Sequence, residues 1–174
     1  MEQVYYNELE TSAGRLLLCA TDEGLCYVRF GSFTENESLL RTWLHKQMRN
    51  FELQHGVRHV LLEDAMRQMR QYFARTLQVF QLPLDIYGTA FQKQVWSALQ
   101  QIEYGTTKSY KEIAEALAHP RAVRAVGMAN NRNPLSIVIP CHRVIGHDGR
   151  LVGYGGGIEA KKALLALEGF QQYQ

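Results

Sequence analysis

The chain has 174 residues, of which 46% are hydrophobic and 21% are charged, and its formal net charge is +2. This composition predicts a globular protein of one large or two small domains. The chain has neither a signal-peptide pattern nor an apolar run of the roughly 18 residues that a membrane span needs. We therefore expect a cytoplasmic protein that has no membrane partner.

The charge is unevenly distributed along the chain. Residues 1–87 carry a net charge of −2, whereas residues 88–174 carry a net charge of +4. The difference is modest, and it fits an acidic half beside a half that binds nucleic acid.

Three widely spaced cysteines, Cys19, Cys26 and Cys141, are an odd number and include no CxxC pair. This spacing predicts neither a disulfide framework nor a zinc site, and the six histidines add no metal-ligand pattern. Cys19 and Cys26 lie in apolar, strand-like segments, so we interpret both as core residues.

The first half of the chain is predicted to combine strands with helices. Alternating apolar residues between turn residues indicate an antiparallel meander of three strands, at residues 4–9, 14–20 and 24–30. Apolar residues at helical spacing then predict helices over Glu37–Met48 and Leu61–Leu77.

A break in the pattern follows at QLPLDIYG, residues 81–88, where Pro83 and Gly88 interrupt both periodicities. We place a domain boundary in this stretch. The predicted domains are residues 1–84 and residues 85–174.

The second half contains two clear helix start signals. Thr89 followed by Gln92 is a capping box that opens TAFQKQVWSALQQI. Ser109 followed by Glu112 is a second capping box, which opens SYKEIAEALA.

A third helix is predicted directly after the second. His119-Pro120 separates the two, because proline suits the first turn of a new helix. The third helix, RAVRAVGMANN at residues 121–131, ends before Asn133-Pro134. Two short helices joined by a tight break predict a helix-turn-helix.

The second helix of this pair has an unusual surface. Its side chains are mostly small, Ala125 among them, with Arg121 and Arg124 between them. Such a helix suits the minor groove of DNA, where backbone and shape matter more than base edges. The same pattern fits a helix that packs tightly in a core, and both interpretations stay open.

The segment IVIPCHRVIG, residues 137–146, places polar side chains inside an apolar run. Pro140 stiffens the approach to Cys141, and His142 is the obvious base to activate the thiol. In an extended segment, neighbouring side chains point to opposite faces, so a water must bridge sulfur and imidazole unless the chain turns. The alternative is a buried structural cysteine beside a histidine whose hydrogen bonds are satisfied.

Two further residues have both a functional and a structural interpretation. Glu168 immediately precedes Gly169, a predicted helix C-cap, where a carboxylate faces the unfavourable end of the helix dipole. It is either a solvated glutamate or the residue that orients His142 in a Cys–water–His–Glu relay. Asn133 either caps its helix or ties that helix to the cysteine segment.

Together these motifs resemble those of a known family. PCHRVIG, preceded by RAVG and NP and followed by GYGGG and KxxLLxxEG, is similar to the O6-alkylguanine-DNA alkyltransferases, or methylated-DNA–protein-cysteine methyltransferases. The resemblance is dense from Thr89 to Gly169, and residues 1–84 share only the family's layout. It implies an α+β fold, in which a ribonuclease-H-like α/β domain with an antiparallel meander precedes a helical domain that carries the helix-turn-helix.

The resemblance also implies a DNA-repair reaction. Cys141 would accept the alkyl group from O6 of guanine by in-line displacement, and His142 would act as the base through a water. Glu168 would hold His142, and Asn133 would brace the active-site turn. Because the thioether product is stable, transfer would be irreversible and each molecule would act once, without a cofactor or an obligate protein partner.

The implied substrate is double-stranded DNA containing O6-alkylguanine, bound from the minor groove with the damaged nucleotide flipped out of the stack. Arg124 would fill the vacated space, and Ala125 belongs to the small-residue surface that enters the groove. Tyr110 would lie beside the flipped base and donate a proton or hydrogen bond as guanine leaves.

The implied pocket uses backbone groups as well as side chains. The carbonyls of Cys141 and Val144 would recognise the exocyclic amine of guanine, and Tyr154 with the Gly155 amide would form the pocket wall. Some members have serine where Gly155 stands. Some also bind zinc in the N-terminal domain, but this chain lacks a plausible ligand set, so we expect no metal.

Three other functions fit parts of the pattern. A non-catalytic binder of alkyl lesions would share the pocket but lack the reactive cysteine. A helix-turn-helix regulator would use the Cys-His pair structurally, and a thiol hydrolase would use Cys141 and His142 in turnover.

Overall fold

The computed structural model describes residues 1–170 and divides into two compact units, one of residues 1–87 and one that starts at Gly88. The first unit is built around a β-sheet and the second mainly from helices, which confirms the predicted α+β class. Within the described range, no helix is long and apolar enough to cross a membrane.

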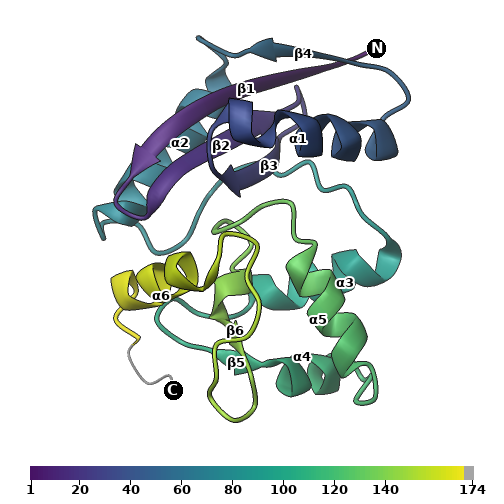
Figure 1. Cartoon of the computed structure of the whole chain (residues 1–174), viewed down its shortest axis with the longest axis vertical. Coiled ribbons are helices and arrows are strands. Elements are labelled where there is room, and N and C mark those ends of the chain that lie inside the picture. Colours follow the sequence, from purple (N-terminus) through teal and green to yellow (C-terminus); the bar gives the residue numbers. More distant parts are fainter. Residues whose placement is uncertain (171–174) are drawn as a thin grey trace. The chain divides into compact units, whose positions relative to one another are not determined.

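A four-stranded sheet forms the centre of the first unit (Figure 1). β1 pairs antiparallel with β2, and β2 with β3, so the predicted meander is confirmed. The sequence pattern missed β4, which pairs parallel with β1 at the sheet edge, because β4 is short and none of its residues is fully buried. The strands are Glu2–Thr11 (β1), Gly14–Ala20 (β2), Leu25–Phe30 (β3) and Phe51–His55 (β4).

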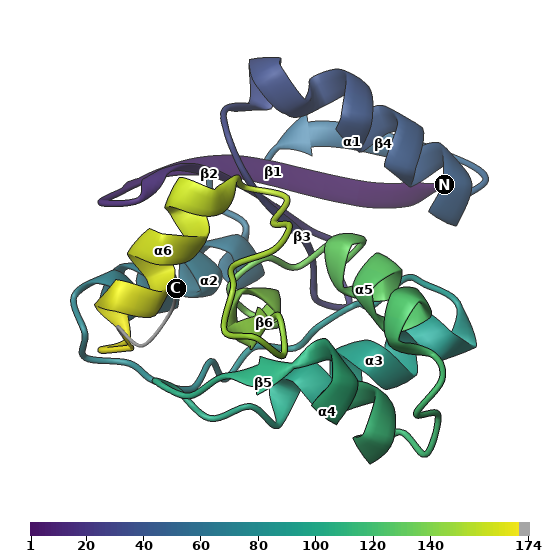
Figure 2. The same ribbon diagram turned by 60° about the horizontal axis from the view of Figure 1, so that its bottom comes forward.

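Two helices, α1 (Phe33–Gln47) and α2 (Val60–Phe73), cover opposite faces of this sheet (Figure 2). Because both faces are covered, the residues of β2 from Leu16 to Ala20 are all buried. Successive side chains of a strand point to opposite faces, so alternate residues of β2 pack beneath each helix.

The two helices differ from their predicted limits for local reasons. α1 starts earlier than predicted because the Ser32 side chain accepts a hydrogen bond from the backbone N–H of Glu35 and caps the helix. α2 ends at Phe73, before the predicted Leu77, and Arg75 adopts a φ of 62° there. A residue in this left-handed region ends a helix.

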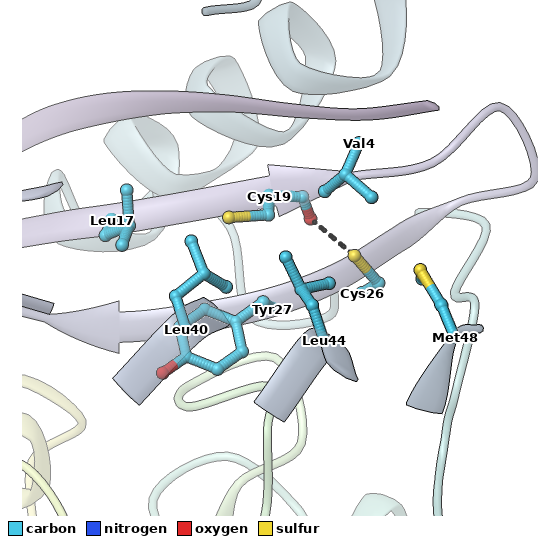
Figure 3. Close-up of a cluster of buried hydrophobic side chains, with 8 residues drawn as sticks. All are labelled: Val4, Leu17, Cys19, Cys26, Tyr27, Leu40, Leu44 and Met48. Atoms are coloured by element: carbon cyan, nitrogen blue, oxygen red, sulfur yellow. Dashed lines mark hydrogen bonds between the residues drawn. The ribbon is translucent and has the colours of Figure 1, made fainter. Parts of the chain in front are cut away.

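One hydrophobic cluster lies between the sheet and α1 (Figure 3). It contains both cysteines of the first unit, and the Cys26 thiol donates to the Cys19 carbonyl at 3.5 Å. Burial raises the pKa of both thiols, so they remain protonated at neutral pH. The structure therefore confirms that these two cysteines are core residues. The cluster consists of Val4, Leu17, Cys19, Cys26, Tyr27, Leu40, Leu44 and Met48.

The second unit contains the predicted helices in the predicted order (Figure 2). α5 packs against both α3 and α4, and the Trp96 indole N–H donates to the Ala129 carbonyl at 2.9 Å, which joins α3 to α5. The helices are α3 (Ala90–Gln100), α4 (Tyr110–Ala116), α5 (Val123–Asn131) and α6 (Ile158–Leu167), with a short 3-10 helix at Cys141–Arg143.

Two very short strands connect distant parts of this unit. β5 (Lys108–Ser109) pairs parallel with β6 (Val144–Ile145). The cysteine-containing turn ends where β6 begins, and α4 begins where β5 ends. The pairing therefore brings Tyr110, the first residue of α4, beside the segment that follows Cys141.

Both predicted capping boxes are present. The side chains of Thr89 and Ser109 accept hydrogen bonds from the backbone N–H groups of Gln92 and Glu112, whose side chains bond back to the cap residues. Gly88 precedes the first box, and a Cβ on Gly88 would lie 2.5 Å from the Trp96 ring. Only glycine allows the chain to pass so close to this indole.

Removal of the second cap tests how much it stabilises the helical unit. Ser109→Ala should lower the free energy of unfolding by about 1 kcal/mol, because the backbone N–H of Glu112 loses its acceptor. Ser97→Ala, in the exposed interior of α3, is the matched control and should leave stability unchanged or slightly higher. Urea denaturation measures both values, and equal effects would contradict the cap's role.

Candidate active site

The backbone before Cys141 makes two tight turns. The N–H of Val138 donates to the Ser136 carbonyl at 2.9 Å, and the N–H of Cys141 donates to the Ile139 carbonyl at 2.8 Å. Such i to i+2 contacts are γ-turns. Ile137, at the centre of the first turn, has a φ of 74°, which is a strained conformation for a β-branched residue.

The cysteine segment itself is not extended. Residues 141–143 form one turn of 3-10 helix, so an extended conformation at the Cys-His pair is the wrong description. Two tight turns precede it, which sequence alternation cannot reveal. Neighbouring side chains at 141 and 142 are therefore not forced onto opposite faces of a strand.

Asn133 ties the end of α5 to the cysteine segment. Its side-chain amide donates to the Ile139 carbonyl at 2.8 Å, and its side-chain oxygen accepts from the N–H of Leu135 at 2.9 Å. The Asn133 side chain also acts on Cys141, where it lowers the pKa of the thiol. Of the two sequence interpretations, the structural tie is therefore the one that the contacts support.

Cys141 is 5% exposed, yet its surroundings differ from those of the two core cysteines. Burial raises the pKa of the Cys141 thiol, but four groups oppose that shift. They are the Asn133 amide, the Lys161 ammonium and the backbone N–H groups of Cys141 and His142. Each of these groups stabilises a thiolate, so the sulfur lies in a site that can hold negative charge.

His142 forms a buried pair with Glu168. The imidazole Nε2 and the carboxylate Oε1 are 2.8 Å apart, and both side chains are fully buried. Burial would raise the pKa of Glu168, but hydrogen bonds from His142 and Arg143 and the charge of Arg143 outweigh it and lower that pKa. The carboxylate is therefore ionised, and Nε2 donates its proton to it. Glu168 is not a solvated glutamate.

The other imidazole nitrogen is left as a proton acceptor. Burial lowers the pKa of His142, against the opposing effect of Glu168, so the ring is neutral at pH 7. With Nε2 protonated, Nδ1 carries the free lone pair. Nδ1 is buried and has no hydrogen-bond partner in the described part of the chain. A buried, unpaired acceptor of this kind is suited to binding a water and taking its proton.

Glu168 reaches this position from the end of α6. The N–H of Phe170 donates to the Leu165 carbonyl and that of Gly169 to the Ala166 carbonyl, which together form a Schellman motif. Gly169 has a φ of 85°, as its predicted role at the helix end requires. The motif directs the Glu168 side chain back beneath the cysteine turn.

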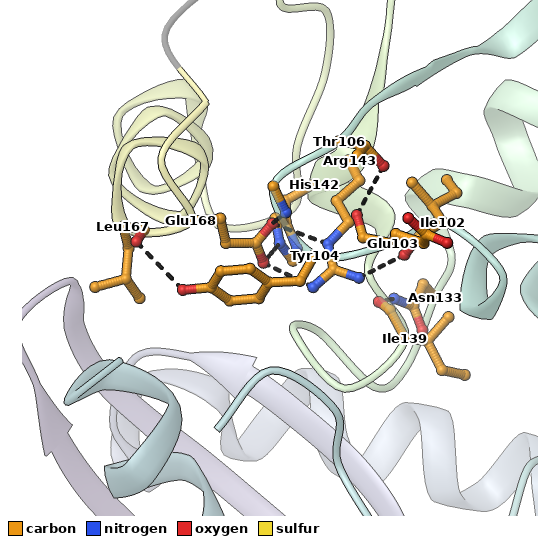
Figure 4. A network of polar contacts seen from close by, with 11 residues as sticks. Ile102, Glu103, Tyr104, Thr106, Asn133, Ile139, His142, Arg143, Leu167 and Glu168 are labelled. Atoms are coloured by element: carbon orange, nitrogen blue, oxygen red, sulfur yellow. Dashed lines mark hydrogen bonds and ion pairs between the residues drawn. The ribbon is translucent and has the colours of Figure 1, made fainter. Parts of the chain in front are cut away.

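Arg143 shares the same carboxylate (Figure 4). Its Nε donates to Oε2 of Glu168 at 2.9 Å and its Nη2 to Oε1 at 2.8 Å, while Nη1 donates to the Ile102 carbonyl at 2.6 Å. The guanidinium is buried in an ion pair, so it is not available to a phosphate.

Lys161 lies fully buried on α6. Its ammonium donates to the Val144 carbonyl at 2.6 Å and more distantly, at 3.4 Å, to the carbonyls of Val152 and Gly153. No carboxylate of residues 1–170 forms an ion pair with it, and burial lowers the pKa of Lys161 to about 8. The Lys161 ammonium thus occupies one lone pair of the Val144 carbonyl.

Two tyrosines lie within electrostatic reach of the sulfur. The Tyr110 hydroxyl donates to the Val152 carbonyl at 2.9 Å, and burial together with the Cys141 thiolate raises the pKa of Tyr110 to about 12. The pKa of Tyr154 is also raised, mainly by burial and to a smaller extent by the charge of Cys141. Gly155, next along this loop, is exposed, and a Cβ there would meet no atom within 4 Å. Serine in place of Gly155 is therefore sterically acceptable.

α5 has two different faces. Val126 and Ala129 are buried against the rest of the unit, and a Cβ on Gly127 would lie 3.8 Å from the Tyr110 ring. Arg124 and Ala125 are exposed, and no described contact joins either of them to the Cys141 site. The small residues thus serve close packing on one side and leave an open surface on the other.

Several contacts of this site had no sequence signal. The loop between α3 and β5 supplies the Ile102 carbonyl and the Gly105 N–H, which donates to Glu168 Oε2 at 3.3 Å. Backbone groups are common to all residues, so no motif marks them. Over the described residues, no group of three or more His, Cys, Asp or Glu side chains is arranged to hold a metal ion.

Comparison with known protein families explains this arrangement. Residues 90–170 match the family model "6-O-methylguanine DNA methyltransferase, DNA binding domain", and residues 4–86 match the ribonuclease-like domain of the same family. The chain belongs to the 6-O-methylguanine DNA methyltransferase family. The family predicted from the sequence motifs is thereby confirmed, together with its methyltransferase class.

Individual members of the family are similar over nearly their whole length. The methylated-DNA–protein-cysteine methyltransferase of Methanosarcina acetivorans is 42% identical over 95% of this chain and 99% of its own. That of Mycolicibacterium paratuberculosis is 44% identical over 95% and 92%. Among solved structures, the Mycobacterium tuberculosis OGT in complex with DNA is 39% identical over 95% and 92%, with a TM-score of 0.76.

Because the Lys161 ammonium is buried, it makes the free energy of unfolding vary with pH in the alkaline range. Its pKa is about 8 when folded and about 10.4 when unfolded, so between these values the unfolded chain binds more protons. Lys161 should therefore contribute a positive slope to the free energy of unfolding in this range, of up to about 1.4 kcal/mol per pH unit, while the buried thiols of Cys19 and Cys26 contribute a negative one. Urea denaturation at pH 8, 9 and 10 measures the slope.

The Lys161→Met variant should lose this contribution, because methionine does not titrate, so its slope of unfolding free energy against pH should be lower than that of wild type. The neighbouring Lys162, which is partly exposed and pairs with Glu159 at 3.4 Å, offers the matched control Lys162→Met. The control should keep the wild-type slope. An unchanged slope in Lys161→Met would contradict the assignment of the effect to Lys161.

Proposed function

We propose that this protein repairs DNA by transferring an alkyl group from O6 of guanine to Cys141. The observation that carries the proposal is the Cys141–His142–Glu168 arrangement, in which the imidazole is neutral, oriented through Nε2, and free to accept a proton at Nδ1. Membership of the methyltransferase family supports the same reaction. The protein acts on double-stranded DNA that carries O6-alkylguanine.

The chemical step begins with proton transfer. A water between Cys141 and His142 passes the thiol proton to Nδ1, and Glu168 stabilises the imidazolium through Nε2. The thiolate then attacks the carbon bound to O6 of guanine. A sulfur–carbon bond forms as the carbon–oxygen bond breaks, and the electron pair of the broken bond passes to the guanine. Tyr110 donates a proton or a hydrogen bond to the leaving guanine, which neutralises or stabilises the negative charge that this electron pair brings.

The product explains why the reaction is stoichiometric. A thioether has no leaving group that the site can expel, so Cys141 stays alkylated and the protein acts once. No cofactor is needed, because the group to be transferred arrives with the DNA and the acceptor is a residue of the chain. The reaction requires no obligate protein partner.

DNA binding is assigned to the exposed face of α5. We place this face in the minor groove, where Ala125 allows close approach and Arg124 fills the space left by a flipped nucleotide. α4 and α5 form the helix-turn-helix of this interaction. The carbonyls of Cys141 and Val144, with Tyr154 and the Gly155 amide, then surround the extruded base.

Mass spectrometry tests the transfer directly. After incubation with duplex DNA containing O6-methylguanine, the protein should gain one methyl group, on the peptide that contains Cys141 rather than on those with Cys19 or Cys26. Cys141→Ala should gain none and still bind the DNA. A thiol hydrolase would show turnover without a lasting adduct, whereas a regulator or a non-catalytic lesion binder would remain unmodified.

The role of Arg124 is tested by comparing two substrates. Arg124→Ala should slow methyl transfer from duplex DNA by about tenfold or more, since extrusion of a base costs a few kcal/mol and 1.4 kcal/mol corresponds to tenfold. Transfer from free O6-methylguanine should be unaffected. Arg132→Ala, an exposed arginine at the end of the same helix, is the control. Equal slowing on both substrates would remove Arg124 from the flipping step.

A further inference from the structure

The carboxylate of Glu168 serves more than one partner (Figure 4). Its Oε1 accepts from His142 Nε2 and from Arg143 Nη2, both at 2.8 Å. Its Oε2 accepts from Arg143 Nε at 2.9 Å and from the Gly105 N–H at 3.3 Å. The proposed relay uses only the first of these four contacts, so three of them have no assigned function.

Arg143 is held rigidly in its place beside this carboxylate. The guanidinium donates to the Ile102 carbonyl at 2.6 Å and lies 5.7 Å from the centre of the Tyr104 ring. The Tyr104 hydroxyl in turn donates to the Leu167 carbonyl at 3.3 Å. Arg143 is only 7% exposed, so its charge is poorly screened by solvent.

We propose that Arg143 is a positioning residue that keeps His142 available as a proton acceptor, by sharing the Glu168 carboxylate that orients the imidazole. This inference rests on the proposed function, because it assigns a purpose to the neutral state of His142. A carboxylate that pairs with imidazole alone would favour the imidazolium, which cannot take the proton of Cys141. The two-point contact of the Arg143 guanidinium partly neutralises the Glu168 carboxylate, so the carboxylate stabilises an imidazolium less. The hydrogen bond from His142 Nε2 still orients the ring.

The charges around His142 support this division of roles. From α6, the Glu168 carboxylate and the Lys161 ammonium act on the imidazole, and within its own turn it adjoins Arg143 and Cys141. Burial lowers the pKa of His142, Glu168 raises it, and Arg143 and Lys161 lower it. An imidazolium would add a third buried cation to Arg143 and Lys161, of which only Arg143 pairs with Glu168. Loss of the Arg143 charge therefore makes protonation of His142 more favourable.

The remaining ionisable groups act on the sulfur rather than on the imidazole. The phenols of Tyr110 and Tyr154 are both influenced by Cys141. Neither phenol carries charge at neutral pH, because burial raises the pKa of both. Arg143 is thus a charge that can be removed without removing a proposed reacting group, and it shares the Glu168 carboxylate with His142.

The test is the pH dependence of single-turnover methyl transfer from duplex DNA containing O6-methylguanine. In Arg143→Met, the acidic limb of the rate profile should move to higher pH by about one unit. The reason is that loss of the neighbouring cation makes protonation of His142 more favourable. Transfer well below the limb should then be about tenfold slower than wild type, and transfer on the alkaline plateau should be within about threefold of it. Arg41→Met removes an exposed arginine that pairs with Glu37 in the first unit, so it controls for net charge.

A spectroscopic readout keeps the inference testable independently of DNA. The His142 ring signals, followed by NMR against pH, should show a higher midpoint in Arg143→Met than in wild type. If that variant does not fold, Arg143→Lys replaces it. Its ammonium cannot form the two-point contact, and it should shift the midpoint in the same direction by less.

The outcomes separate the two claims. If Arg143→Met and Arg143→Lys slow transfer by the same factor at every pH and leave the His142 midpoint unchanged, Arg143 is merely structural and the inference is overturned. If the wild-type protein transfers no methyl group, the proposed function itself fails, whatever the midpoint does. An upward shift of both the acidic limb and the midpoint supports the positioning role.

Discussion

The buried carboxylate of Glu168 is the interaction on which the helical unit depends. A charge removed from water is costly unless hydrogen bonds and an opposite charge compensate for it. Here the compensation comes from the Arg143 fork, the imidazole of His142 and the Gly105 N–H. These donors belong to the cysteine turn and to the loop before β5. One charge therefore holds together the end of α6, that loop and the candidate nucleophile.

The three cysteines show how surroundings rather than burial determine reactivity. All three are buried, and burial raises the pKa of each thiol. Cys19 and Cys26 lie in a hydrophobic cluster, whereas Cys141 has an amide, an ammonium and backbone N–H groups around its sulfur. Those groups favour the thiolate, so only Cys141 occupies a site in which a nucleophile can form at moderate cost.

The backbone around Cys141 is held in an unusual form by a small number of contacts. Ile137 stays in a strained conformation because Asn133 fixes the carbonyl of Ile139 and the turn that follows it. Strain of this kind persists only where surrounding contacts over-determine the chain. The same side chain acts on the thiol and adjoins the end of α5. The helix assigned to DNA and the sulfur assigned to chemistry are thus linked through one side chain.

The sequence by itself determined the elements and the chemical groups. The capping boxes at Thr89 and Ser109, the glycine at 169 and the core positions of Cys19 and Cys26 follow from local patterns and side-chain type. The resemblance to the family, carried by motifs of a few residues, named Cys141 and its partners. Such features are encoded within a few residues of the chain, where physical preferences act without help from distant segments.

Only the tertiary structure decided which groups meet. It showed that β4 extends the sheet, that β5 pairs with β6, and that the cysteine segment turns instead of running extended. It also gave Arg143 a carboxylate and Lys161 three carbonyls, where the motifs had left both without a partner. The physical reason is that the strand pairings and the Lys161 contacts use backbone groups, which every residue carries and no sequence pattern distinguishes. The Arg143–Glu168 pair joins side chains 25 positions apart, which only the folded chain brings together.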